Sequence, residues 1–113
     1  MRSWGSCGYL PSYAPRSDHA CCVSPAGCNP DIVLKKPPTE YLKQLHFDAF
    51  VFTPEAIRHL AAQVGASQLM LGSDHPYPWE QHPVDLIFGC GSLSEQEKVA
   101  VLHDNAARML GLH

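Results

Sequence analysis

The sequence predicts an α/β protein with parallel strands. Two apolar segments rich in β-forming residues, 46–52 and 68–72, flank an amphipathic segment, 53–67, that is long enough for a helix. A strand, a helix and a second strand in this order join parallel neighbours of one sheet. Parallel strands need covered faces and neighbours, so we expect these two strands to belong to a larger sheet.

The composition narrows the class of protein. The chain has 113 residues, a formal net charge of −3, and 45% hydrophobic and 17% charged residues, and this low charged content with ordinary hydrophobicity argues against intrinsic disorder. Only 8 residues are Lys or Arg, so we expect no nucleic-acid partner. No apolar run approaches the ~20 residues of a membrane helix, and no apolar signal follows Met1, so we expect a cytoplasmic protein without a membrane partner.

The first third of the chain is predicted to be irregular. Residues 1–38 contain six of the 10 prolines, each of which removes an amide donor and restricts the backbone. Thr39 is then expected to cap a short helix over residues 39–45, with Pro38 blocking its extension upstream.

The crossover helix has clear end signals. Thr53 and Pro54 are typical of a helix start, and Gly65 is typical of a helix end. Between them Ile57 and Leu60 belong to an apolar stripe at helical spacing, so one face of the helix is expected to pack on the sheet.

The C-terminal third is predicted to be helical after a loop over residues 73–79. Residues 84–88 are expected to form a helical turn. Ser94 with Glu97 is a capping box for a helix that runs to about His103. Asp104 or Asn105 is expected to cap a final helix that ends at Gly111.

Asp74 is the sharpest candidate for chemistry. It follows the end of the second apolar strand, and parallel α/β folds present their functional groups at the carboxyl ends of strands. A carboxylate there can bind a divalent metal or transfer a proton. The alternative is an ordinary turn residue, a position in which Asp is common.

Two further groups carry open alternatives. Arg16 either pairs with Asp18 or binds a carboxylate substrate through its forked guanidinium. His19, Cys21, Cys22 and Cys28 have the chemistry of zinc ligands, but their spacing matches no common zinc motif. Because five cysteines occur without a secretory signal, reduced thiols are the expected state.

Several segments together resemble the C-terminal part of the amidohydrolase-related family, which includes decarboxylases. The resemblance covers roughly residues 8–112. It is carried by Gly72-Ser-Asp-His-Pro-Tyr-Pro-Trp79, Asn105-Ala-Ala-Arg-Met-Leu-Gly-Leu112, Gly8–Arg16, Lys36–Leu42, Phe47-Asp48 and Phe52–Ala56.

The resemblance implies the last two βα units, with a preceding loop, of a metal-dependent (β/α)8 TIM barrel. In that family one divalent metal, usually zinc, is bound by a His-x-His pair, a later His and an Asp after the last strand, and Asp74 matches this Asp. Arg16 matches an Arg that binds the substrate carboxylate across a dimer interface. The implied function is a decarboxylase or hydrolase of a small carboxylate substrate, with a homo-oligomer or a full-length relative as partner.

The chain also departs from the family pattern. No two of its 7 histidines are arranged as His-x-His, and Gly5 stands where the family has the His of a His-Gly-Gly-Gly segment. Residues 1–7 are therefore interpreted as a divergent N-terminus, and residues 8–113 as the C-terminal part of the family domain. One of four metal ligands is present, so we expect a truncated chain that is inactive alone. The alternatives are a non-catalytic remnant that docks on a relative, and a small Cys/His zinc module.

Overall fold

Three short parallel strands form the centre of the structure, in the spatial order β1-β2-β3. The computed structural model describes residues 2–3, 9–23 and 35–112. β1 (Arg2–Ser3) pairs with β2 (His46–Asp48), and β2 pairs with β3 (Leu69–Met70). In the register Phe47 lies opposite Leu69, and Asp48 lies opposite Met70. The parallel α/β arrangement that the sequence predicts is confirmed.

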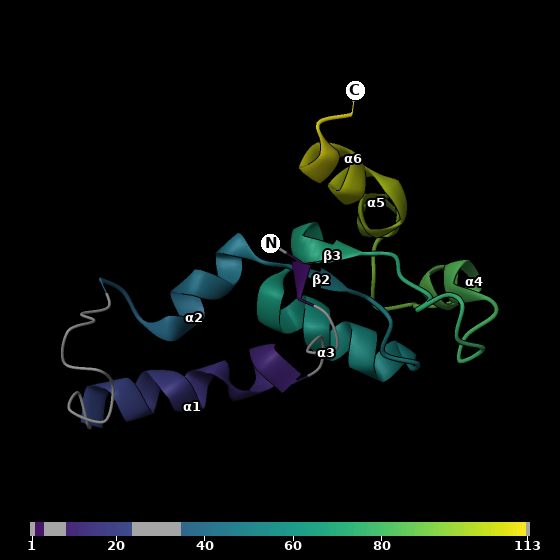
Figure 1. Cartoon of the computed structure of the whole chain (residues 1–113). Coiled ribbons are helices and arrows are strands. Elements are labelled where there is room, and N and C mark those ends of the chain that lie inside the picture. Colours follow the sequence, from purple (N-terminus) through teal and green to yellow (C-terminus); the bar gives the residue numbers. More distant parts are fainter. Residues whose placement is uncertain (1, 4–8, 24–34, 113) are drawn as a thin grey trace.

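Helices follow each strand. They are α1 (Tyr9–Val23), α2 (Pro38–Tyr41), the 3-10 turn η2 (Leu42–Gln44), α3 (Pro54–Val64), the 3-10 turn η3 (Ala66–Gln68), α4 (Pro83–Phe88), α5 (Glu95–Val99), the π-helical turn η4 (Ala100–Asp104) and α6 (Asn105–Leu110). Figure 1 shows α3 on one side of the strands and α5 with α6 on the other. The helices thus cover the strands as a parallel sheet requires.

The core lies between the strands and these helices. Phe47 of β2, Leu69 of β3 and Ile57 of α3 are fully buried, and they pack in one cluster with Ile87 and Val101 from the C-terminal third. The apolar stripe of the crossover helix therefore packs inward as predicted. The Thr53 hydroxyl accepts a hydrogen bond from the Ala56 amide at 3.2 Å and caps α3.

The prediction of one irregular stretch over residues 1–38 is wrong for the part that the structure describes. Residues 9–23 form α1, and residues 2–3 form a third strand. Pro11 lies in the first turn of α1, where the missing amide costs no intrahelical bond. Pro15 lies inside the helix. Packing of α1 against α2 and α3 therefore overrides the local preference of this proline.

The predicted cap of the next helix is also wrong. α2 begins at Pro38, with Pro37 at the N-cap position, so Thr39 lies in its first turn. The Thr39 amide donates to Asp18 Oδ1 at 2.8 Å, and the Thr39 hydroxyl donates to Asp18 Oδ2. A carboxylate on α1 thus satisfies the donors at the start of α2.

The C-terminal helices form one continuous helical segment instead of two separately capped helices. The Ser94–Glu97 capping box is confirmed, since both of its hydrogen bonds are present. Asp104 has a helical backbone and makes no side-chain cap, and Asn105 is buried. The π-helical turn η4 connects α5 to α6, so the expected break at Asp104 is absent. No helix in the described part of the chain is long and apolar enough to cross a membrane.

Candidate functional site

Asp74 lies on the loop that leaves the carboxyl end of β3. Its side chain is exposed, and its backbone has a left-handed φ of 58°. The Asp74 carbonyl accepts a hydrogen bond from the Tyr77 amide at 3.0 Å, which closes a turn around His75 and Pro76. The structure therefore places Asp74 at the carboxyl end of the sheet, where the sequence predicts a functional carboxylate.

Asp48 is a second carboxylate at this end of the sheet, and the sequence indicates it only as part of the family resemblance, not as a site residue. It ends β2, and its Oδ1 accepts a hydrogen bond from the Phe50 amide at 2.7 Å. The same carboxylate occupies the position that a β-carbon on Gly72 would take. Asp48 is thus in contact with the residues that follow both β2 and β3. A strand prediction that stops at the acid instead of running to Phe52 would have found it.

Aromatic side chains gather on the two loops that follow β2 and β3. The rings of Tyr77 and Trp79 stack nearly parallel, with centroids 6.0 Å apart and an interplanar angle of 7°, and both side chains are exposed. Phe50 and Phe52 follow β2 with centroids 4.5 Å apart. Exposed rings beside a carboxylate offer flat apolar surface to a planar ligand.

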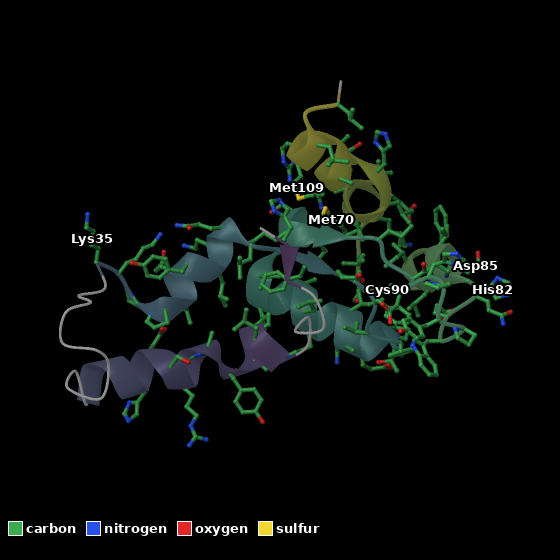
Figure 2. The ribbon with its side chains drawn as sticks, viewed as in Figure 1. Lys35, Met70, His82, Asp85, Cys90 and Met109 are labelled. Carbon is green, nitrogen blue, oxygen red and sulfur yellow. The ribbon has the colours of Figure 1, made fainter. Side chains whose placement is uncertain are left out.

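A histidine and an acid flank this loop at the start of α4. His82 Nδ1 lies 3.8 Å from Asp85 Oδ2, and both side chains are exposed to solvent. Figure 2 shows the two side chains beside each other near α4. This pair is an exposed contact at the start of a short helix, and such pairs contribute little to stability.

Arg16 lies on α1, away from this loop. Its side chain is exposed, and among the described residues it makes no ion pair. Asp18, its predicted alternative partner, is bound to Thr39 instead. Figure 1 shows α1 running beneath α3 and away from the loop after β3. The structure therefore does not bring Arg16 and Asp74 of one chain together.

The predicted Cys/His group receives no support from the described residues. Cys28 lies outside them, the side chains of Cys21 and Cys22 are likewise outside the description, and His19 is exposed. Cys90 is buried as a free thiol, 3.2 Å from the Ser92 hydroxyl. Within residues 2–3, 9–23 and 35–112 no three His, Cys, Asp or Glu side chains gather around a possible metal position.

For the divalent metal that the resemblance implies, the described residues therefore supply one suitable ligand and too few others. The Asp74 carboxylate is an oxygen ligand of the kind that Zn²⁺ and Mn²⁺ accept. A metal site needs at least three protein ligands to hold its ion against water. The described part of the chain supplies one candidate, so it does not by itself make a complete metal site.

Comparisons with known proteins show the family. The amidohydrolase family model matches residues 21–112, so the chain belongs to the amidohydrolase family. It is 32% identical over 106 residues to a 2-amino-3-carboxymuconate-6-semialdehyde decarboxylase of Dictyostelium discoideum. That match covers 93% of this chain and 29% of the relative. The chain thus spans less than a third of this curated relative.

Solved structures agree on the fold. The 5-carboxyvanillate decarboxylase LigW of Sphingomonas paucimobilis superposes with a TM-score of 0.80 at 24% identity, over 92% of this chain and 31% of that one. A dihydroxybenzoic acid decarboxylase of a Polaromonas species, solved with bound manganese and 2-nitroresorcinol, superposes with a TM-score of 0.72 at 19% identity, over 90% and 30%. The structure is therefore a partial α/β unit of the amidohydrolase TIM-barrel fold.

Proposed function

We propose that this chain carries one wall of the active site of a divalent-metal-dependent decarboxylase that acts on a small carboxylate. Asp74 is the metal ligand that the chain contributes, and the remaining ligands come from outside the described residues. The observation that carries the proposal is the place of Asp74, which follows β3 at the carboxyl end of a parallel sheet in a member of the amidohydrolase family.

The surroundings of Asp74 support this role. Asp48 and Gly72 hold the first residues of the loop against the end of β2, so the loop leaves the sheet in a defined direction. The metal would supply Lewis acidity toward a substrate oxygen. The exposed rings of Tyr77 and Trp79 would pack against the flat face of an aromatic carboxylate.

Arg16 is proposed to bind the substrate carboxylate in a second copy of the chain. Its exposure on α1 and its distance from the Asp74 loop favour this reading over a role in its own site. Guanidinium groups bind carboxylates through two parallel hydrogen bonds, which suits recognition across an interface.

A manganese titration followed by NMR tests the role of Asp74. Mn²⁺ broadens the amide signals nearest to its ligand, so we expect early broadening at Ser73, Asp74 and His75. Asp74→Asn should remove this pattern. Asp85→Asn, which changes another exposed aspartate beside the same loop, should leave it intact. Broadening that is centred elsewhere, or that survives Asp74→Asn, contradicts the proposal.

Decarboxylation is tested separately, with 2,6-dihydroxybenzoate and 5-carboxyvanillate as substrates and Zn²⁺ or Mn²⁺ as the ion. The chain alone is expected to release no CO₂ above the uncatalysed rate, because one carboxylate binds the ion too weakly to keep it in place for catalysis. Turnover by the isolated chain that disappears in Asp74→Asn would confirm a decarboxylase and overturn the expected need for further ligands.

A further inference from the structure

Two successive γ-turns connect β2 to α3. The Val51 amide donates to the Ala49 carbonyl at 3.0 Å, and the Thr53 amide donates to the Val51 carbonyl at 2.8 Å. Phe52 lies at the centre of the second turn with a φ of 66°, the sign of the rare and strained form of this turn. A positive φ is a steric outlier for a residue as bulky as phenylalanine, whereas glycine adopts it without strain.

The segment is held on both sides by described residues. The Asp48 carboxylate accepts a hydrogen bond from the Phe50 amide at 2.7 Å, directly after β2. On the other side Thr53 caps α3, because its hydroxyl accepts from the Ala56 amide at 3.2 Å and its carbonyl accepts from the Ile57 amide at 3.1 Å. Strained backbone persists where its surroundings fix it in this way. The conformation of the turn is therefore set within this chain, whatever other parts of the barrel fold pack beside it.

The loop that carries Asp74 begins beside this segment. The Ala49 amide donates to the Met70 carbonyl at 2.8 Å, which pairs the start of the first loop with the end of β3. The Leu71 amide donates to the Val101 carbonyl at 3.0 Å, which fixes the end of β3 to the C-terminal helical segment. Both loops thus leave the carboxyl end of the sheet from fixed positions, and the loops at this end build the active sites of TIM barrels.

The turns also bring two aromatic rings together. The ring centroids of Phe50 and Phe52 lie 4.5 Å apart, with an interplanar angle of 54°. The Phe52 side chain is 54% exposed, so burial among the described residues does not offset the strain of its backbone. The strained turn instead presents an aromatic ring at the end of the sheet where Asp74 lies.

We propose that Phe52 is a specificity-determining residue, whose ring packs against the ring of the substrate and so favours aromatic over saturated carboxylates. The inference rests on the proposed function and adds a substrate preference to it. Aromatic pairs adopt tilted or offset arrangements, and one such pair changes affinity by about twofold to tenfold. A saturated ring lacks the electrostatic part of this contact.

Metal-free binding to the whole chain tests the preference. Benzoate and cyclohexanecarboxylate carry the same charge and the same number of carbon atoms, and NMR titrations compare their dissociation constants. The parent chain should bind benzoate about twofold to tenfold more tightly. Phe52→Leu keeps an apolar side chain, so it should weaken benzoate binding by that factor and leave cyclohexanecarboxylate binding nearly unchanged.

Two further variants serve as controls. Phe52→Tyr retains an aromatic ring and should keep the benzoate preference. Phe88→Leu changes a similarly exposed ring at the end of α4, 56% exposed, and should also keep it.

Several results would overturn the inference. They are a parent chain that binds the two ligands equally or binds neither, a preference that survives Phe52→Leu, and a preference that is lost in Phe52→Tyr or Phe88→Leu. Because no metal is present, the outcome is independent of whether Asp74 binds Mn²⁺, which is the test of the proposed function.

Discussion

The carboxylate of Asp48 occupies the position that a β-carbon on Gly72 would take, so a side chain there would have to displace it. The two residues belong to the ends of adjacent parallel strands, and Asp48 is held in place by its hydrogen bond from the Phe50 amide. The direction in which the Asp74 loop leaves the sheet thus depends on a residue from the preceding strand.

Gly72→Ala is expected to destabilise the fold by about 1–3 kcal/mol, the usual cost of forcing extra atoms into a filled space. The new methyl group displaces the Asp48 carboxylate from Phe50. Urea denaturation measures the change in the free energy of unfolding.

A double-mutant cycle tests the cause. In an Asp48→Ala background the clash is absent, so Gly72→Ala should cost much less there than in the parent chain. Equal costs in both backgrounds would show that the clash with Asp48 is not the reason.

Asp18→Ala is expected to cost about 1–2 kcal/mol, the range of a lost helix cap. The carboxylate accepts from both the amide and the hydroxyl of Thr39, and both donors lose their partner. Thr39→Val removes only the hydroxyl and should cost less. Thermal unfolding ranks the two variants, and the opposite order would contradict this account of the cap.

Stability is expected to fall as the pH drops below about 6.5, the ordinary pKa of histidine. Burial lowers the pKa of His46, with smaller contributions from the positive amino terminus and Arg108. Between the folded and unfolded pKa values the unfolded chain binds the extra proton, so acid favours unfolding. Among the described residues Nδ1 of this ring is buried without a hydrogen-bond partner.

His46→Gln checks the source of this pH dependence. The variant should show a flatter decrease of unfolding free energy between neutral and mildly acidic pH. His103→Gln changes an exposed histidine and serves as the control. An unchanged slope in His46→Gln would exclude His46 as the cause.

Ser94→Ala is expected to destabilise the chain by about 1 kcal/mol through loss of the capping box. The hydroxyl accepts from the Glu97 amide at 3.2 Å, and the Glu97 carboxylate accepts from the Ser94 amide at 2.7 Å. Gln96→Ala alters an exposed neighbour and should have almost no effect on the melting temperature. A neutral Ser94→Ala would mean that packing alone holds the start of α5.

Local signals predicted the elements whose ends are set by single side chains. Thr53, Gly65 and Ser94 act where the sequence places them, because a cap depends on residues within one turn. The position of Asp74 after a strand followed from the same local patterns. The helix through Pro15 did not, because packing against α2 and α3 stabilises it and no local pattern reports that packing.

Contacts between residues far apart in the chain could not be predicted from the sequence for the same reason. Two of these features are contacts between segments far apart in the chain: the bond between Asp18 and Thr39, and the contact between Asp48 and Gly72. The third is the π-helical turn before Asn105, which adjusts a helix to the neighbouring strand. The role of Asp74 as a metal ligand and of Arg16 as a substrate ligand stay predictions, since both require groups beyond the described residues.

The hydrogen bond from the Leu71 amide to the Val101 carbonyl also affects which changes in loop length this chain can tolerate in evolution. It brings together the two ends of the segment 72–100, which holds the Asp74 loop, α4 and α5. Closing a loop between fixed ends becomes only slightly harder as residues are added, and surface loops tolerate such insertions well. The segment beside Asp74 can therefore lengthen or shorten, and so acquire new ligand preferences, while the sheet behind it keeps its register.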